Sequence, residues 1–331
     1  MLASSDLLHL PYTPDLTEAG ISYACRSLSF FAYNRMGSSP IDRLRHIVAG
    51  VAVELAFRRY LGEQAVPFDV QGAAPFTDPD SYQVTLGGHR CNVKSYRISR
   101  REQITLLRQN PSIVLQAPAL VPLDEFAAEA ARPDDLYLFA FLLGLEAASR
   151  EDENKALSAG QPVHLIHPLP DTWARPSNWI PFDELTLKSE AAAPLTVEIG
   201  GQNADREFVT TSLELPPMAR VPVEQSFYSL TCIHAHSQPE ARLGLHSSVR
   251  TEAIIIAPHE WGNIWVYGLE ILLTGWLSRE EFRRRASLLN AGMPTFQYAR
   301  TRTKNLLVPV AGLDPLGELF ERVRLWEAQK V

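Results

Sequence analysis

The Gly87-Gly88 pair separates two segments, residues 82–86 and 89–96, in which side chains alternate in polarity. Two such segments on either side of a Gly-Gly loop are typical of a tight β-hairpin, because glycine readily adopts the positive φ angles of this turn. A two-residue loop also sets the register of the strands. We therefore predict that Leu86 pairs with His89, and that pairing continues outward from this point.

The predicted register decides which side chains share a face of the hairpin. Successive residues of a strand point to opposite faces. Gln83 is then expected opposite Asn92, and Lys94 lies on the same face. The other face carries the apolar residues Val84 and Cys91. The sequence thus predicts a lysine and two carboxamides on one face of a small sheet.

The segments around the hairpin predict an α/β domain. Ser39-Pro40 is a good helix start and Gly62 a good helix stop. Leu136–Leu145 is a continuous apolar run, as expected of a buried central strand. The expected order is helix, three strands, helix, strand, over residues 40–61, 66–70, 82–86, 89–96, 101–109 and 136–145. Further helices are expected at residues 16–36 and 124–131.

Glu54 lies on the apolar stripe of the predicted helix 40–61, with Ile47, Val51 and Leu61. A carboxylate on a buried face needs a partner or a metal ion. The spacing favours an i, i+4 ion pair with Arg58. The alternative is a carboxylate that serves a functional site.

These residues resemble the PD-(D/E)xK nuclease superfamily: Glu54 on the helix, then Pro79-Asp80-Ser81-Tyr82-Gln83-Val84, the Gly-Gly turn and Asn92-Val93-Lys94-Ser95. The resemblance implies a restriction-endonuclease-like αβββαβ core over about residues 40–145, which residues 264–331 could complete. Glu54 would match the helix acid and Lys94 the motif lysine. It also implies Mg²⁺-dependent hydrolysis of DNA, with restriction or defence as the context.

The sequence departs from this family at two positions. Gln83 and Asn92 stand where the family has carboxylates, and carboxamides carry no negative charge. Because Mg²⁺ prefers carboxylates, we expect a metal site of Glu54, Asp80, Gln83 and Asn92 to be weak or absent. Three states remain open: a natural pseudo-nuclease, a chain whose catalytic acids have been replaced, or a site that uses Asp80. The alternative function is an inactive nucleic-acid-binding subunit of a larger complex.

Basic residues are clustered although the net charge is −7. We interpret three clusters as candidate phosphate contacts, with a solvated helical face as the alternative for the second. The clusters are Arg97, Arg100 and Arg101; Arg283, Arg284 and Arg285; and Arg300, Arg302 and Lys304. DNA is the partner that the resemblance implies, and a protein partner or homodimer is possible.

The rest of the chain predicts an additional antiparallel β-rich unit. We expect a nuclease-like domain over residues 1–150, a β-rich domain over 160–260, which could be an insertion, and C-terminal elements over 264–331 that could complete the first domain. Residues 146–162 are polar and are interpreted as a linker or an exposed excursion.

Cysteine content and hydropathy predict the compartment. The chain has 3 cysteines, an odd number, and has no apolar run near the roughly 20 residues that span a bilayer. We expect a cytoplasmic protein with reduced thiols and no membrane partner. Cys232, His234 and His236 share one strand face, and a zinc site there is a minor alternative.

Overall fold

The computed structural model describes residues 2–27, 40–70, 84–127, 132–146, 149–159, 164–235, 237–250, 252–263 and 267–329. The chain divides into two compact units. The mixed-sheet unit comprises residues 1–20, 49–145 and 268–331, and the β-rich unit comprises residues 21–48 and 146–267. Residues 268–331 therefore belong to the same unit as the hairpin. Residues 21–48, which include helical segments, belong to the β-rich unit.

The mixed-sheet unit is built on a six-stranded sheet with the order β1-β16-β6-β4-β3-β2. Strands β4 and β6 are parallel, whereas β2–β3, β3–β4 and β1–β16 are antiparallel. Along the chain the elements α2, β2, β3, β4, α3 and β6 come in the expected order of helix, three strands, helix and strand, but a further strand (Pro118–Pro122) and a short helix (Leu123–Phe126) lie between α3 and β6. Their bounds are α2 (Pro40–Glu63), β2 (Asp69–Val70), β3 (Val84–Leu86), β4 (His89–Ile98), α3 (Arg101–Gln109) and β6 (Leu136–Leu145), with β1 (Leu8–Pro11) and β16 (Tyr267–Ser278) beside them.

The hairpin between β3 and β4 has the predicted register. Leu86 pairs with His89, and Val84 pairs with Cys91. Gly87 and Gly88 have φ angles of 61° and 89°, which match the positive angles of a type I′ turn. A type I′ turn has a loop of two residues, so the Gly87-Gly88 pair fixes which residues of the two strands are opposite each other. The local sequence therefore determines the register of the hairpin.

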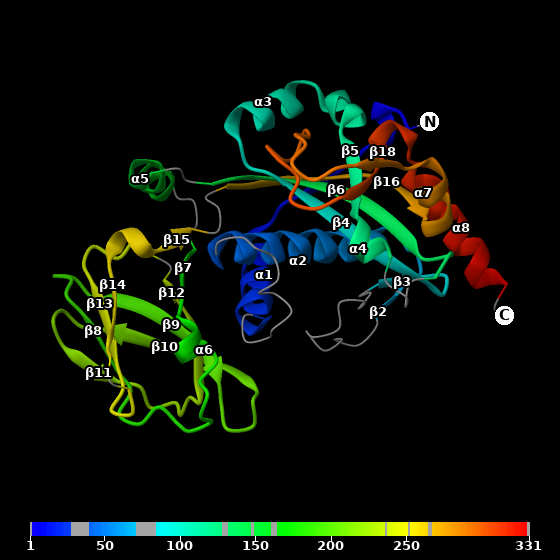
Figure 1. The fold of residues 1–331 in the computed structure, drawn as a ribbon. Coiled ribbons are helices and arrows are strands. Elements are labelled where there is room, and N and C mark those ends of the chain that lie inside the picture. The colour runs from blue at the N-terminus through cyan, green and yellow to red at the C-terminus, as the bar shows by residue number, and fades with distance from the viewer. Residues whose placement is uncertain are drawn as a thin grey trace. The chain divides into compact units, whose positions relative to one another are not determined.

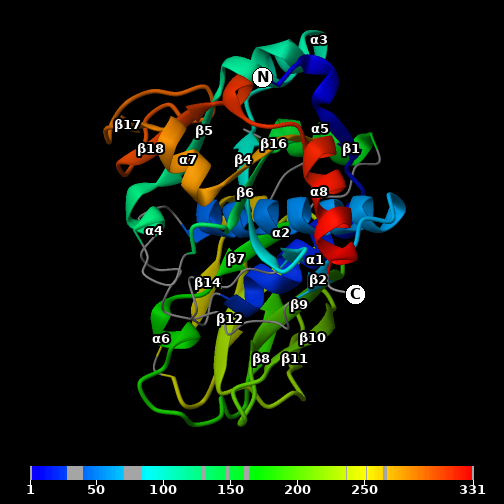
Figure 2. The same ribbon diagram turned by 90° about the vertical axis from the view of Figure 1, so that its right-hand side faces the viewer.

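Two layers cover the mixed sheet. In Figures 1 and 2, α2 lies on one face, and α3 with β5 (Pro118–Pro122) lies on the other. A Cβ atom added at Gly50 of α2 would lie 3.7 Å from the Ser95 hydroxyl of β4. On the other face Tyr96 and Phe139 belong to a core that also contains Phe282 of α7 (Arg279–Arg285). Strand β6 is buried on both faces, as its continuous apolar run predicts.

A small antiparallel sheet, with the order β17-β18-β5, was not expected from the sequence. Val121 of β5 pairs with Leu306 of β18, which is 185 residues later in the chain. Short strands that pair over such a distance leave little local signal. The other strands and the last helix are β17 (Ser287–Leu289), β18 (Asn305–Pro309) and α8 (Leu316–Ala328).

The β-rich unit contains two antiparallel sheets, as predicted in general form. Their orders are β10-β9-β12-β7-β15 and β11-β8-β13-β14, and a common apolar core contains residues of both. The bounds of the first sheet are β7 (Leu165–Pro168), β9 (Leu195–Gln202), β10 (Phe208–Leu215), β12 (Ser229–Ala235) and β15 (Gly262–Asn263). Those of the second are β8 (Thr186–Ser189), β11 (Arg220–Pro222), β13 (Leu243–His246) and β14 (Ile254–Ile256).

Several predicted helices differ in extent. The polar segment 146–162, interpreted as a linker or an exposed excursion, contains α5 (Arg150–Ser158), which begins after Ser149, whose hydroxyl accepts a hydrogen bond from Asp152 N at 3.2 Å. The helix expected at 124–131 is described only as α4 (Leu123–Phe126), and α1 (Pro14–Ser27) ends at Ser27 within the described residues. None of the described helices is long and apolar enough to cross a bilayer.

We predict that Gly87→Ala destabilises the hairpin. A Cβ at residue 87 would lie 2.6 Å from Cε3 of Trp326, and the φ angle of 61° is unfavourable for alanine. We expect a loss of about 1–3 kcal/mol of unfolding free energy, measured by chemical denaturation followed by circular dichroism. Gly62→Ala is the control, because a Cβ there meets no atom within 4 Å. Equal effects of the two changes would contradict the assigned role of Gly87.

Candidate functional site

Three polar side chains meet on one face of the hairpin. The Lys94 ammonium group forms an ion pair with Glu125 Oε1, and Asn92 Nδ2 donates to the same oxygen at 3.3 Å. Only 12% of the Lys94 side chain is exposed, compared with 36% for Glu125. Asn92 and Lys94 share a face because they are two residues apart on β4. The predicted convergence of Asn92 with Lys94 is therefore present.

Short helix α4 positions Glu125. The Leu123 amide at its start donates to the Lys304 carbonyl at 3.0 Å, which holds α4 against the loop before β18. On the other side of α4, the Phe126 ring stacks under the Arg279 guanidinium, 4.4 Å from the ring centroid. These contacts hold Glu125 over β4.

A second ion pair lies on the same face of β4. The Arg90 guanidinium donates to both carboxylate oxygens of Asp135, at 2.8 and 2.6 Å. Asp135 is almost fully buried, with 1% of its surface exposed, and it also accepts from the Arg132 amide at 2.6 Å. A carboxylate buried to this degree is stable only with such donors. Arg90, Asn92 and Lys94 thus form a polar stripe along β4 that ends at the buried Tyr96.

Glu54 does not join this stripe. It forms an ion pair with Arg58, whose Nη2 lies 2.6 Å from Glu54 Oε1. The Glu54 carboxylate acts electrostatically on the Cys91 thiol. Cys91 and Lys94 are an odd number of positions apart on β4, so their side chains lie on opposite faces of the strand. The expectation that Glu54 lies close to Lys94 is therefore not met: α2 covers the face of β4 opposite to Lys94. The i, i+4 pair with Arg58, favoured by the spacing, is what the structure contains.

Burial changes the titration of the groups under α2. Burial raises the pKa of Glu54 to about 7, although the Arg58 guanidinium opposes the shift. Burial, together with the Glu54 charge, raises the pKa of the Cys91 thiol to about 12. Near neutral pH the Cys91 thiol is therefore protonated, and Glu54 exchanges its proton close to physiological pH.

Asp80 and Gln83 lie outside the described residues. Extending the hairpin register by one pair would place Gln83 opposite Asn92, and this stays a prediction. Among the residues that the structure describes, no group of three His, Cys, Asp or Glu side chains is arranged to hold a metal ion. On the Lys94 face the nearby carboxylate, Glu125, is already neutralised by an ammonium group. These donors do not fit Mg²⁺.

One member of each of two basic clusters lies near the Tyr298 hydroxyl. Arg97 of β4 and Arg302 both act electrostatically on the Tyr298 hydroxyl, which itself is buried enough for its pKa to rise. The Gln103 side chain of α3 donates to the Phe296 carbonyl at 2.7 Å, which ties α3 to the same loop. The remaining members of these clusters are exposed: Arg100, Arg101, Arg300 and Lys304.

The third cluster lies on α7 and is largely engaged by acids. Arg284 and Arg285 both pair with Glu281, and Arg285 Nη1 also lies 3.0 Å from Asp314 Oδ1. Arg283 is exposed. Pairs of this kind at exposed positions are typical of a solvated helical face.

The minor zinc alternative finds no support among the described residues. His234 contacts the ring of His164, with Nε2 and Nδ1 3.3 Å apart, and Cys232 lies beside the Cys25 thiol. His236 is outside the described residues. All three cysteines of the chain are free thiols.

Glu125 is the site residue that sequence reasoning missed. It is 31 positions from Lys94, in a segment with no motif, and only its place in an acidic helix start could have drawn attention to it. Comparisons of the chain with protein-family models, with curated proteins and with solved structures found no match. The site is therefore interpreted from its own geometry.

We predict a pH-dependent stability that depends on Glu54. The folded chain holds this proton up to about pH 7, whereas the ordinary pKa is 4.5, so the folded state binds more protons between these values. The unfolding free energy of the protein should therefore fall by up to about 3 kcal/mol as the pH rises from 4.5 to about 7. In Glu54→Gln this loss should be absent, so the variant gains on the parent as the pH rises from 4.5 to about 7.

The measurement is chemical denaturation of both proteins at several pH values. Glu63→Gln is the matched control, since Glu63 is exposed at the end of the same helix. A stability difference between Glu54→Gln and the parent that does not change with pH would contradict the assignment.

Proposed function

We propose that this protein is a PD-(D/E)xK-type nuclease domain that acts on DNA, with its phosphodiester hydrolysis impaired or lost. The restriction-endonuclease-like core, the restriction or defence context and the cytoplasmic location belong to the same proposal. The observation that carries it is twofold. The helices and strands come in the order that the resemblance implies, and a lysine and a polar residue lie together on one face of the hairpin.

The sheet topology supports this proposal. Strands β2, β3 and β4 form an antiparallel meander, and a connection that contains α3, β5 and α4 then leads from β4 to the parallel strand β6. The resemblance implies this αβββαβ order. Fold alone does not establish activity, which depends on the side chains that β4 presents.

Lys94 is the group on this face suited to phosphate chemistry. An ammonium group can neutralise charge that develops on a phosphoryl oxygen. Glu125 holds that ammonium group next to Asn92, at the position where the hairpin motif ends. In this arrangement Lys94 has a defined orientation before any substrate binds.

The same contacts explain why hydrolysis is expected to be weak. A dication needs negative ligands, and the described groups near Lys94 offer one carboxylate already paired with it. Glu54, the expected helix acid, lies on the opposite face with Arg58. We therefore derive no metal-dependent step for the native sequence.

We predict that Gln83→Asp combined with Asn92→Asp creates Mg²⁺-dependent cleavage of plasmid DNA. Two carboxylates would return two negative charges to the Lys94 face, where a metal ion could then bind and activate water. We expect cleavage at least roughly 100-fold above the native chain, and its loss when Lys94→Met is added. The readout is conversion of supercoiled plasmid, with Mn²⁺ binding measured separately.

Lys155→Met in the double variant is the matched control, because Lys155 is an exposed lysine on α5. If the double variant binds Mn²⁺ but does not cleave DNA, the nuclease function is contradicted. If the double variant binds Mn²⁺ no better than the native chain does, the proposed geometry of the site is contradicted. Robust cleavage by the native chain that is lost in Asp80→Ala would make Asp80 the working acid.

The second candidate is an inactive nuclease-fold subunit that binds nucleic acid. The Lys94–Glu125 pair favours it, because this site is neutral without a metal. The approach of Arg97 and Arg302 around Tyr298 favours it too, since phosphate binding requires grouped cations.

We predict that DNA binding depends more on the loop before β18 than on α7. The triple change of Arg300, Arg302 and Lys304 to Ala should lower the slope of log affinity against log salt by roughly 0.9 for each phosphate that is no longer neutralised. Ala at Arg283, Arg284 and Arg285 should change it less, because Glu281 already neutralises part of that cluster. Fluorescence anisotropy at about 50–200 mM salt gives both slopes. Unchanged slopes in both variants would assign these residues to solvated surface.

A further inference from the structure

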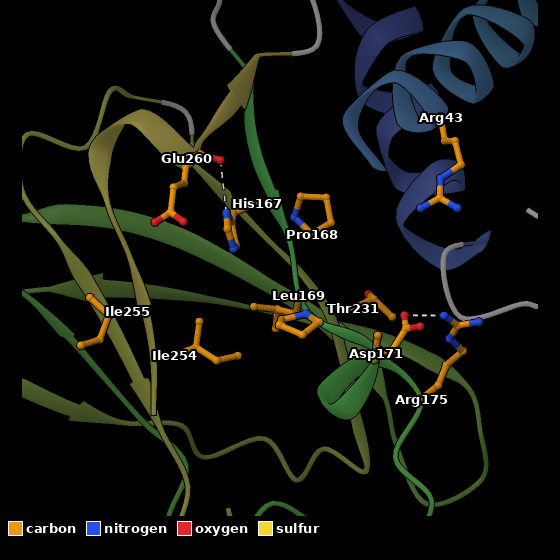
Figure 3. Close-up of a pocket in the computed structure, with 12 residues that line it drawn as sticks. Arg43, His167, Pro168, Leu169, Asp171, Arg175, Thr231, Ile254, Ile255 and Glu260 are labelled. Atoms are coloured by element: carbon orange, nitrogen blue, oxygen red, sulfur yellow. Dashed lines mark hydrogen bonds and ion pairs between the residues drawn. The ribbon is translucent and has the colours of Figure 1, made fainter. Parts of the chain in front are cut away.

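The β-rich unit contains a cavity of about 500 Å³ that the nuclease proposal does not use. Small-ligand sites usually measure about 300–1,000 Å³. The cavity is bounded by β7 and the segment that follows it, by β12 and β14, and by one side chain of α2 (Figure 3). Its polar lining includes Arg43, Arg175, His167 and Thr231.

Two anchors hold Arg43 at this cavity. A Cβ added at Gly262 would overlap the side chain of Ile41, so the start of α2 packs tightly against β15. Arg45, two residues after Arg43, donates from Nε and Nη2 to the Asn263 carbonyl at 2.8 and 2.6 Å. Because β15 pairs with β7, these contacts place Arg43 beside the strand that lines the cavity.

The second guanidinium comes from Arg175, at the end of α6 (Asp171–Ala174). It forms an i, i+4 ion pair with Asp171, whose side chain is 79% exposed. An ion pair this exposed contributes little to stability, so a bound anion can compete with it. Figure 3 shows both guanidinium groups on the side of the cavity where Thr231 lies.

On the other side of the cavity the charged side chain is that of Glu260. His167 Nδ1 lies 3.2 Å from the Glu260 carbonyl oxygen, to which it donates, and burial lowers the pKa of this imidazole. The ring is then neutral, and Nε2 is an acceptor turned away from Glu260 (Figure 3). The Glu260 carboxylate accepts from the Ala257 amide at 2.6 Å. Apolar side chains, Leu169 and Ile254 among them, complete this side.

We propose that this cavity binds a nucleoside monophosphate or a nucleotide end of that size. The phosphate group lies between the guanidinium groups of Arg43 and Arg175. The base lies on the side of His167, Leu169 and Ile254, where an imidazole nitrogen can accept from an exocyclic amine. Two guanidinium groups suit a phosphate dianion, because each offers paired N–H donors. The proposal does not rest on nuclease activity.

Isothermal titration of the full chain tests this with three probes: deoxycytidine monophosphate, deoxycytidine and inorganic phosphate. The nucleotide should bind more tightly than either fragment. Arg43→Met and Arg175→Met should each weaken its binding by roughly 10-fold or more, as expected when a hydrogen bond to a charged group is removed. Arg242→Met is the control, since Arg242 is exposed in the same unit and pairs with Glu190.

Arg175→Glu provides a second test, at the end of α6, where the Arg175 side chain is 23% exposed. It should abolish nucleotide binding by charge reversal, and circular dichroism shows whether the variant is folded. Three results would overturn the proposal: no nucleotide binding at millimolar concentration, equal binding of phosphate and nucleotide, or nucleotide binding that is unchanged in the Arg175 variants.

Discussion

Strand β4 presents odd-numbered side chains to α2 and even-numbered side chains to the opposite layer, and the polar groups of the mixed-sheet unit follow this division. Cys91 and Ser95 lie on the α2 side, near Glu54 and Gly50. Asn92 and Lys94 lie on the other side with Glu125. A strand cannot direct neighbouring residues to one face. Glu54 and Lys94 are therefore separated by the sheet itself.

Carboxylates from other segments balance the cations on the Lys94 face of β4. Arg90 and Lys94 each have a carboxylate partner, Asp135 and Glu125, that comes from a segment other than the hairpin. Half-buried cations need such partners, because desolvation of an uncompensated charge costs several kcal/mol. The paired face holds a lysine in place without a metal ion. This is the physical distinction between the proposed domain and a metal-dependent hydrolase with two hairpin acids.

The two units differ in how their polar groups are used. In the mixed-sheet unit the cations of β4 are paired with carboxylates, which fixes the orientation of their side chains. In the β-rich unit Arg43 and Arg175 face a cavity of ligand size, and the Asp171 partner of Arg175 is largely exposed. A weak exposed pair can be exchanged for a ligand contact, whereas the buried Arg90–Asp135 pair cannot.

Local sequence determined the hairpin, its register and the buried strand β6, because turn geometry and side-chain alternation act between close neighbours. It also determined the Glu54–Arg58 pair, which needs only one helical turn. Only the tertiary structure decided which face of β4 α2 covers, that Glu125 meets Lys94 across 31 residues, and that β5 pairs with β18. These contacts depend on packing between distant segments. Their positions follow from how the layers bury apolar surface, which spacing along one segment does not encode.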